Sequence, residues 1–463
     1  HSTYSDAEEV KKMNEPLQGN FEGIGVQFQM IEDTLLVVQP VSNGPSEKIG
    51  ILAGDRIIAV NDSAIAGVKM STEEIMKRLR GPKGSKVNLK IVRRGVQDPL
   101  VFTVKRDKIP ILSLDASYMI QPKTGYIRIN RFGATTAEEF KKAMKELQKQ
   151  GMKDMILDLQ GNGGGYLNAA IDLANEFLGQ KELIVYTEGR TAKRSDFYAK
   201  GNGEFRNGRL IVLVDEYTAS ASEIVSGAVQ DWDRGIIVGR RSFGKGLVQR
   251  PIDLPDGSMI RLTIARYYTP AGRCIQKPYD SSTDYNKDLI ERFNHGELMN
   301  ADSIHFPDSL KVQTKKLGRT VYGGGGIMPD YFVPIDTTLY TDYHRNLVAK
   351  GAVIKFTMKF IEGHRKELAN KYKKFESFNE KFIIDDDMLA TLREMGEKEG
   401  VKFNEEQYQK SLPLIKTQLK ALIARDLWDM NEYFRVMNTT NESVQKALEI
   451  LNSEEYQKKL RAN

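Results

Sequence analysis

The 463-residue sequence is poor in the side chains that most often build reactive centres. It contains one cysteine, Cys274, and five histidines that are scattered along the chain without metal-ligand spacing. A single cysteine excludes an internal disulfide and a cysteine cluster that could hold zinc or an iron–sulfur group. Chemistry on this chain is therefore expected to use neither a metal nor a histidine base, and we expect no cofactor.

Long apolar runs and a strong excess of one charge are also missing. No stretch approaches the roughly 18 apolar residues that a membrane-spanning helix needs, so we expect no membrane-spanning segment. The 68 basic and 62 acidic residues give a net charge of +6. They form no local basic stripe of the kind that binds nucleic acid. The sequence begins at His1 with neither an initiator Met nor a signal region, so we expect that an upstream segment was removed.

What is present is a globular composition, with 40% hydrophobic and 28% charged residues, and a length that suits about three domains. Residues 21–106 have the pattern of short strands separated by turns, with two short helices. Residues 107–336 alternate strands with amphipathic helices, which predicts a mostly parallel sheet covered by helices. Residues 337–463 carry Lys/Glu-rich helical patterns, whose charge runs we interpret as solvated helix faces. The predicted fold class is therefore α/β with several domains.

Two glycine-rich segments invite a phosphate-binding interpretation. Gly161-Asn162-Gly163-Gly164-Gly165 lies between a predicted strand and a predicted helix, but Tyr166 stands where a dinucleotide fingerprint needs its third glycine. The segment 239–246 resembles a P-loop, except that Gly246 replaces the hydroxyl residue that holds magnesium. A P-loop must also open a helix, whereas residues 247–252 have an extended pattern. Nucleotide hydrolysis is therefore disfavoured, and a plain tight turn stays open for the first segment.

A third segment, Thr218-Ala219-Ser220-Ala221-Ser222-Glu223, follows the predicted strand at 210–215 and opens a helix. A serine at such a turn can stand beside helix N-terminal N–H groups that stabilise an oxyanion. The same pattern is typical of simple helix capping. On this motif alone both interpretations stay open.

Lys245, held between Gly244 and Gly246, is the candidate base for that serine. A lysine can act as a base only when neutral, and burial can bring its pKa from about 10.4 to about 7 to 8. Gln249 could orient the amine if the chain bends, because a fully extended segment would separate the two Cα atoms by roughly 13 Å. A surface lysine without a catalytic role is the alternative.

Four ordered motifs together resemble the C-terminal processing peptidases, also called tail-specific proteases, which are Ser/Lys endopeptidases. The motifs are Leu157-Asp158-Leu159-Gln160-Gly161-Asn162-Gly163-Gly164-Gly165, Thr218-Ala219-Ser220-Ala221-Ser222-Glu223-Ile224, Phe243-Gly244-Lys245-Gly246-x-Val248-Gln249 and Tyr268-Thr269-Pro270-x-Gly272-Arg273-x-Ile275-Gln276. The resemblance implies a nucleophile at Ser220, a general base at Lys245 and a positioning residue at Gln249. It also implies an oxyanion hole from the N–H of Ala221 with that of Gly164 or Gly165. One departure is Gln160, where the family commonly has Arg.

The resemblance extends to the first 106 residues. Gly23-Ile24-Gly25-Val26 looks like the carboxylate-binding loop and first strand of a PDZ domain, which captures a peptide terminus as an added edge strand. Arg80 resembles the family's basic residue that senses the bound tail; the alternative is a solvated Arg at a helix end. The implied domains are a PDZ domain at 21–106, a protease core at 107–336 and a helical region at 337–463.

Residues 1–20 look like the remnant of the family's N-terminal helical segment. The family's N-terminal helices, which often serve in dimerisation, are absent from this sequence, so the resemblance leaves a homo-oligomer open. The resemblance further implies an exported protein of the periplasm or cell envelope. Its expected partners are proteins or peptides with free, nonpolar C-termini, which it cleaves under control of the PDZ domain. The alternative function is a noncatalytic PDZ scaffold that binds protein C-termini. The presence of both Ser220 and Lys245 favours the enzyme.

Overall fold

The computed structural model describes residues 2–278 and 287–461. They divide into two compact units, each assembled from segments that are far apart in the sequence. The first unit draws on His1–Gly19, Leu112–Thr337 and Met437–Asn463, and the second on Asn20–Ile111 and Thr338–Val436. The region predicted as one helical domain at 337–463 is thus shared between the two units.

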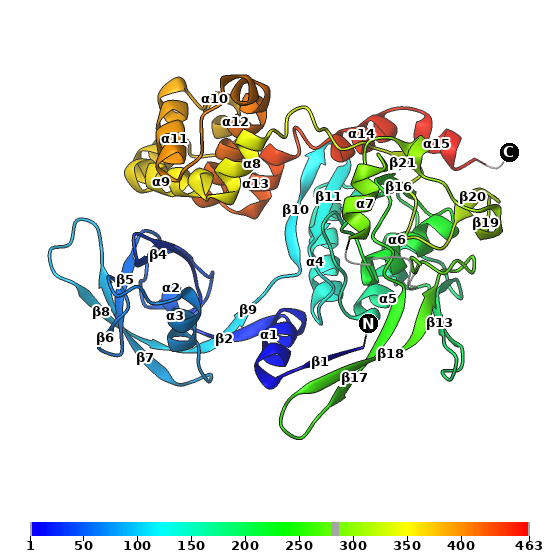
Figure 1. Ribbon diagram of the computed structural model, residues 1–463, viewed down its shortest axis with the longest axis horizontal. Helices are drawn as coiled ribbons and strands as arrows, with labels where there is room; N and C mark the ends of the chain where they lie inside the picture. Colours follow the sequence, from blue (N-terminus) through cyan, green and yellow to red (C-terminus); the bar gives the residue numbers. More distant parts are fainter. Residues whose placement is uncertain (1, 279–286, 462–463) are drawn as a thin grey trace. The chain divides into compact units, whose positions relative to one another are not determined.

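The first unit is built on a six-stranded sheet in the order β10-β11-β12-β15-β16-β21 (Figure 1). Strand β10 pairs antiparallel with β11, and the other neighbouring pairs are parallel, which confirms the predicted mostly parallel sheet. The central strands are continuous apolar runs that are buried along their whole length, as strands covered on both faces must be. The bounds are β10 (Leu114–Gln121), β11 (Thr124–Ile129), β12 (Asp154–Asp158), β15 (Leu210–Val214), β16 (Ile236–Gly239) and β21 (Tyr331–Phe332).

Helices cover this sheet. Helices α4 (Thr136–Lys149), α5 (Leu167–Asn175) and α6 (Ala221–Asp231) share one hydrophobic core with Leu157 of β12 and Val212 of β15. Side chains alternate across a strand, so Ile156 and Ile211 point to the opposite face, where they are equally buried. Helix α14 (Glu442–Asn452) contacts β12, β15 and β16. Residues 437–463 therefore help to complete the sheet's cover.

A second, five-stranded sheet of the first unit has the order β1-β18-β13-β14, with β17 paired to β18. Its strands are β1 (Thr3–Ser5), β13 (Leu183–Glu188), β14 (Ser195–Tyr198), β17 (Leu247–Asp253) and β18 (Met259–Tyr268). The remaining elements of this unit are α1 (Ala7–Gln18), α7 (Asp288–Asn294), α15 (Glu455–Lys459), the 3-10 turns Ala301–Ser303 and Asp308–Leu310, and the hairpin of β19 (Lys311–Gln313) and β20 (Thr320–Tyr322).

The second unit combines a small twisted sheet with a group of helices. The sheet runs β3-β4-β5-β7-β8, with β6 beside β5, so β3 is an edge strand. Its strands are β3 (Val26–Ile31), β4 (Thr34–Pro40), β5 (Arg56–Val60), β6 (Ser63–Ala64), β7 (Lys86–Val92) and β8 (Leu100–Lys105). Short helices α2 (Pro45–Lys48) and α3 (Thr72–Leu79) accompany it, and β2 (Asn20–Gly23) pairs with β9 (Asp107–Pro110) where the segment begins and ends.

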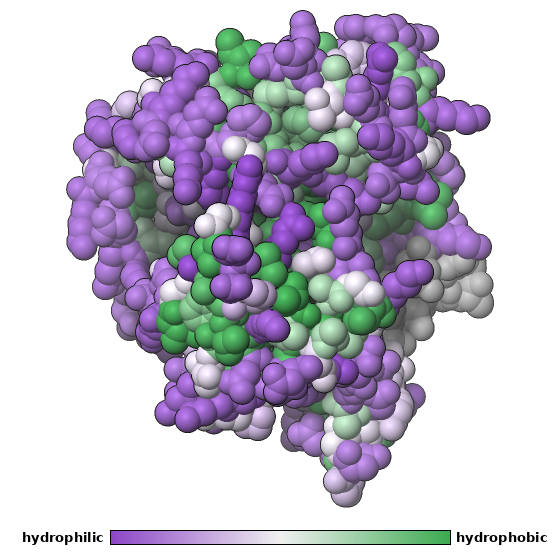
Figure 2. Space-filling model, turned by 90° about the vertical axis from the view of Figure 1, so that its left-hand side faces the viewer, coloured by the Kyte–Doolittle hydropathy of each residue, from purple (hydrophilic) through white to green (hydrophobic). Residues whose placement is uncertain are grey.

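The helices of the second unit are α8 (Asp342–Ala349), α9 (Ala352–Lys371), α10 (Phe375–Lys381), α11 (Asp386–Lys398), α12 (Glu405–Leu427) and α13 (Met430–Met437). An ion pair of 3.0 Å joins Arg56 of β5 to Glu362 of α9 inside this unit. Figure 2 shows that the upper part of this side, where the helices lie, is mainly hydrophilic, while hydrophobic surface gathers lower, over the small sheet. The charged helix faces are thus solvated, as predicted.

Neither a membrane-spanning helix nor a metal cluster stands out in the part of the chain that the structure describes. No helix among these residues is both long and apolar enough to cross a membrane. Within the same residues, His, Cys, Asp and Glu side chains form no group of three or more that could hold a metal ion.

Asp231, the last residue of α6, forms a buried ion pair with Arg273, and the contribution of this pair to stability can be tested. Both the Asp231 and Arg273 side chains are 0% exposed, and they are 2.5 Å apart. Removing one partner of a buried pair leaves the other charge uncompensated, so we expect Asp231→Ala to lower the free energy of unfolding by about 3 to 5 kcal/mol. Urea denaturation measures this change. Asp253→Ala, at an exposed carboxylate on β17, is the control and should stay within about 0.5 kcal/mol of the unsubstituted protein.

Candidate active site

The serine motif and the first glycine-rich motif meet at one edge of the parallel sheet. Strands β12 and β15 are parallel neighbours, with Asp158 opposite Leu213. Their carboxyl ends therefore lie side by side, and one leads into residues 161–165 while the other leads into the Ser220 turn. In open α/β sheets this edge is where ligands bind. The topology alone thus brings the two motifs together.

Buried Asn162 fastens these two loops to each other. Its backbone carbonyl accepts hydrogen bonds from the Ala219 N–H and the Ser222 hydroxyl, both at 3.0 Å. Its side-chain amide donates to the Ile129 carbonyl at 2.8 Å. Gly164 has φ +98°, and a methyl group on it would lie 2.8 Å from the Ser220 Cβ. Only glycine fits at this contact, which explains the glycine in the motif.

Ser220 occupies a strained backbone position at the start of α6. Its φ of +57° and ψ of −114° lie outside the regions that ordinary L-residues favour. Such geometry costs on the order of 1 to 3 kcal/mol and persists only when the surroundings impose it, most often at functional sites. The Glu223 N–H donates to the Ser220 carbonyl at 2.9 Å, so a main-chain oxygen accepts the bond that begins this helix.

The buried carboxylate of Glu223 imposes that conformation. One oxygen accepts hydrogen bonds from the Ser242 hydroxyl at 2.5 Å and the Gly244 N–H at 2.7 Å. The other accepts from the Ser220 N–H at 2.8 Å and the Lys245 N–H at 2.9 Å. Burial raises the pKa of Glu223, while the four hydrogen bonds act in the opposite direction. A single side chain therefore holds the Ser220 and Lys245 backbones against the same oxygen.

Glu223 is part of the serine motif, but the sequence did not indicate that its carboxylate joins the serine turn to the lysine segment. The signal was present, because a Glu three residues after an N-terminal Ser is the pattern of a capping box, in which the Glu bonds back to the N-cap N–H. What the pattern does not contain is the other three donors. Ser242, Gly244 and Lys245 lie about 20 positions along the chain, and only the folded structure brings them to this carboxylate.

Lys245 lies between two glycines whose backbones closely approach other segments. Gly244 has φ +85°, and a methyl group on Gly246 would lie 2.5 Å from the Gln276 backbone nitrogen. The lysine is partly buried. Burial lowers its pKa, the positive charge of Arg261 lowers it further, and the negative charge of Glu223 opposes both. This environment differs from that of a solvated surface lysine.

Gln249 lies on β17, opposite Thr263 of β18, and is partly buried. The pairing of β17 with β18 changes register from Val248 to Gln249, so β17 is irregular at this point. The irregularity lies between Lys245 and Gln249, where a bend would bring the two side chains closer. Residues 247–253 form this strand and not a helix. The P-loop interpretation of 239–246 is therefore excluded by the structure as well as by the missing hydroxyl residue.

The two glycines considered for the oxyanion hole differ in their surroundings. The Gly164 N–H donates to the Asn162 side-chain oxygen at 2.9 Å, and Gly164 is buried. Gly165 is exposed, with its Cα against the Phe132 backbone. Ala221 is the first residue of α6, where backbone N–H groups have no partner within the helix.

The predicted tail-binding residues lie together in the second unit. Gly23 ends β2, Gly25 has φ +73°, and Val26 begins the edge strand β3. The carbonyl of Ile24 accepts hydrogen bonds from the Ser46 N–H at 3.2 Å and hydroxyl at 2.6 Å. Arg80 follows α3, and its Cα is 3.7 Å from where a methyl group on Gly23 would lie. Its guanidinium stacks over the Phe21 ring at 4.8 Å.

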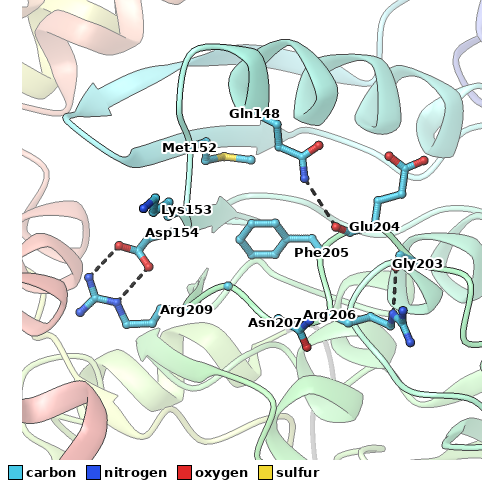
Figure 3. Close-up of a pocket in the computed structure, with 11 residues that line it drawn as sticks. Gln148, Met152, Lys153, Asp154, Gly203, Glu204, Phe205, Arg206, Asn207 and Arg209 are labelled. Carbon is cyan, nitrogen blue, oxygen red and sulfur yellow. Dashed lines mark hydrogen bonds and ion pairs between the residues drawn. The ribbon is translucent and has the colours of Figure 1, made fainter.

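A separate cavity of about 480 Å³ lies in the first unit (Figure 3). It borders Asp154 and Arg209, which precede or begin β12 and β15, so it opens at the amino ends of the parallel strands. Phe205 projects between Met152 above and the Asp154–Arg209 pair, which is joined by hydrogen bonds of 2.9 and 2.6 Å. The described residues that line the cavity include no serine, threonine or cysteine that could act as a nucleophile.

Three segments of the chain match known sequence families. Residues 123–283 match peptidase family S41, and residues 23–108 match the PDZ domain. Residues 343–429 match a family of unknown function. The PDZ match covers the small sheet of the second unit, and the peptidase match covers β12, β15, α6 and the segment that carries Lys245.

Curated relatives agree with these matches. The "Carboxy-terminal-processing protease" of Bartonella bacilliformis is 39% identical over 283 residues, which are 60% of this chain and 64% of that protein. CtpA of Bacillus subtilis, a "Carboxy-terminal processing protease", is 36% identical over 277 residues, 60% of this chain and 58% of that protein. The chain thus spans about three fifths of the length of these two relatives. Among solved structures, the photosystem II D1 C-terminal processing protease is 27% identical, covering 74% of this chain and 80% of that one with a TM-score of 0.37.

One relative aligns over most of both chains. It is the "Probable CtpA-like serine protease" of Staphylococcus aureus strain MRSA252, which is 31% identical over 401 residues, 85% of this chain and 76% of that protein. The resemblance predicted from the four motifs is confirmed by these matches. An alignment this long, together with the peptidase and PDZ matches, shows that the chain belongs to the carboxy-terminal processing protease family.

Proposed function

We propose that this protein is a serine endopeptidase in which Ser220 is the nucleophile and Lys245 the general base. The observation that carries the proposal is the Glu223 carboxylate, one oxygen of which binds both the Ser220 and the Lys245 backbone N–H groups. The two nitrogens are therefore no farther apart than the sum of those two hydrogen bonds. A strained serine beside a lysine whose pKa is lowered by burial meets the requirements of a Ser/Lys pair.

The proposed reaction proceeds through an acyl-enzyme. The Ser220 Oγ attacks the carbonyl carbon of the scissile peptide bond, and its proton passes to neutral Lys245 Nζ. The resulting ammonium returns that proton to the leaving amine as the C–N bond breaks. Lys245 then takes a proton from water, whose oxygen attacks the ester carbonyl. The ammonium returns this proton to the Ser220 Oγ as the ester C–O bond breaks and the new C-terminus is released.

For the oxyanion hole we favour the N–H groups of Ala221 and Gly165. The Gly164 N–H is already donated to Asn162, so its use would leave the Asn162 side-chain oxygen without that buried bond. Gly165 is exposed to an incoming substrate, and Ala221 offers an N–H at the start of α6. Gln249 is the residue that we propose orients the Lys245 amine.

The proposed substrates are proteins with accessible, nonpolar C-terminal tails, which the PDZ domain captures to control cleavage. Supporting this, β3 is an edge strand to which an extended peptide can add, with the Gly23–Val26 loop at its start. Arg80 beside that loop supplies a positive charge for the terminal carboxylate. The family further supports an exported, envelope-associated location and a possible homo-oligomer, as parts of the same proposal.

Loss of either member of the pair is the direct test. We expect Ser220→Ala and Lys245→Ala each to lower cleavage of an unfolded protein with a nonpolar tail by about a thousandfold or more, because both act in every step of bond cleavage. Gel assays of intact substrate measure the loss. Lys350→Ala, at an exposed lysine of the second unit, is the control and should retain full activity. Continued proteolysis in either active-site variant would overturn the assignment of Ser220 and Lys245, whereas a complete lack of cleavage by the unsubstituted protein would favour the noncatalytic scaffold.

The pH profile tests the electrostatics of the site. Cleavage requires neutral Lys245, so its rate rises with pH through the lysine pKa, which burial holds below the ordinary value of 10.5. Glu223→Gln removes the negative charge that raises this pKa, so the rising limb should move to lower pH. The maximum rate should fall, because an amide presents only one oxygen to the four donors and disorders the turn.

A purely structural role for Glu223 would lower the rate at every pH and leave the rising limb in place. Glu138→Gln, at an exposed carboxylate on α4, is the matched control, and both its rate and its pH profile should equal those of the unsubstituted protein.

Tail recognition is tested by binding. We expect Arg80→Ala to weaken binding of a nonpolar peptide with a free C-terminal carboxylate by about tenfold, since a hydrogen bond to a charged group contributes about 1.5 kcal/mol. Calorimetric titration of the peptide gives the dissociation constant, and an amidated peptide of the same sequence should bind both proteins equally weakly. Lys77→Ala, at an exposed residue of α3, is the control. Unchanged binding in Arg80→Ala would remove this residue from the site.

A further inference from the structure

The last helical segment of the first unit contacts the residue that precedes the glycine loop. Residues 437–461 lie outside the three family matches, none of which extends beyond residue 429. Asn441 is the N-cap of α14, and its side-chain oxygen accepts hydrogen bonds from the Ser443 and Val444 N–H groups at 3.1 and 3.2 Å. Because this cap occupies the Asn441 oxygen, the Asn441 amide nitrogen is available to donate elsewhere.

Gln160 is the acceptor for that nitrogen. The Asn441 Nδ2 donates to the Gln160 Oε1 at 3.1 Å, and the Gln160 Nε2 donates to the hydroxyl of buried Ser443 at 3.3 Å. Gln160 is the position at which the family commonly has Arg. An Arg side chain has donors only, so it cannot accept from the Asn441 amide. The departure from the family pattern therefore fits the cap of α14 in this chain.

The backbone of Gln160 is held separately by the sheet. Its N–H donates to the Asp158 carboxylate at 2.8 Å, and its carbonyl accepts from the Arg128 guanidinium at 2.8 Å. Arg128 and Asp158 form an ion pair of 2.5 Å, in which the Asp158 side chain is fully buried. The glycine loop thus starts from a residue that is fixed on two sides, through its backbone by the sheet and through its side chain by α14.

We propose that Gln160 is a positioning residue for the reaction and that α14 holds it through Asn441 and Ser443. The inference rests on the proposed function, in which the Gly165 N–H binds the oxyanion. Gly165 lies five positions after Gln160, and Asn162, which joins the loop to the serine turn, lies two positions after it. A shift of Gln160 therefore displaces the proposed oxyanion donor relative to the serine. A misplacement of about 1 Å lowers a reaction rate by as much as about a hundredfold.

Side chains of similar length test this role. Gln160→Met keeps the length but loses both polar atoms, so we expect kcat to fall by about tenfold with KM within about twofold, because oxyanion contacts act in the transition state. Gln160→Glu should retain nearly full activity, since a carboxylate accepts from both the Asn441 amide and the Ser443 hydroxyl and is favourable at a helix N-terminus. Steady-state cleavage of a fluorescently labelled, unfolded protein with a nonpolar tail gives both constants.

Asn441→Ser removes the contact from the side of the helix. Serine caps helices well but is too short to reach Gln160, so kcat should fall as in Gln160→Met. The double variant Gln160→Met/Asn441→Ser should lose no more than either single variant, since the two residues share one contact. Asn452→Ala is the matched control, because Asn452 forms a similar amide pair with Gln121 at the other end of α14, at 3.0 and 3.1 Å. Its kcat should be unchanged.

The outcomes separate positioning from simple stabilisation. An unchanged kcat in Gln160→Met or Asn441→Ser would overturn the proposal, and so would losses that multiply in the double variant. Equal losses in Gln160→Glu and Gln160→Met, or a loss of the same size in Asn452→Ala, would assign α14 a structural role only. If the unsubstituted protein cleaves nothing, or Ser220→Ala cleaves equally well, it is the proposed function that fails.

Discussion

The geometry of the candidate site depends on one buried carboxylate. Glu223 is fully buried and receives four hydrogen bonds, two at each oxygen. A buried carboxylate without such partners would be strongly unfavourable, so these bonds stabilise the charge while the charge holds four donors in place. Because the donors come from the serine turn and from residues 242–245, two segments that are separate in the sequence become one rigid structure. The strained Ser220 backbone is sustained by this arrangement.

The parallel sheet supplies the rest of the framework. Adjacent parallel strands end at the same edge, so the loops after β12 and β15 must be neighbours. Asn162 then joins the two loops through its backbone carbonyl, while its side chain donates to Ile129 at the end of β11. Gly164 and Gly165 permit the close approach, since each has another backbone or side chain where a Cβ would lie. The glycines here serve contact between loops, and a bound phosphate is not needed to explain them.

The sequence was sufficient for the elements and motifs but not for the contacts between them. The strand predicted before Gly161 and the strand predicted at 210–215 are present as β12 and β15, and the predicted amphipathic helices are present between the strands. The division into units could not be predicted, because the helical pattern of 337–463 does not reveal that residues 437–463 complete the sheet of the first unit. The role of Glu223 was missed for a similar reason, since three of the four groups that donate to its carboxylate are distant in sequence. The choice between Gly164 and Gly165 required knowing that Asn162 occupies one of the two N–H groups.

The same carboxylate creates a conflict at the lysine. Glu223 positions the Lys245 backbone, yet its negative charge favours the protonated amine and so raises the lysine pKa. Two influences oppose this effect, since burial and the positive charge of Arg261 both lower the lysine pKa. The two glycines on either side of Lys245 let its backbone approach neighbouring segments, since a methyl group on Gly246 would lie 2.5 Å from the Gln276 backbone nitrogen. The fold thus places a lysine of lowered pKa beside the acid that binds its backbone N–H.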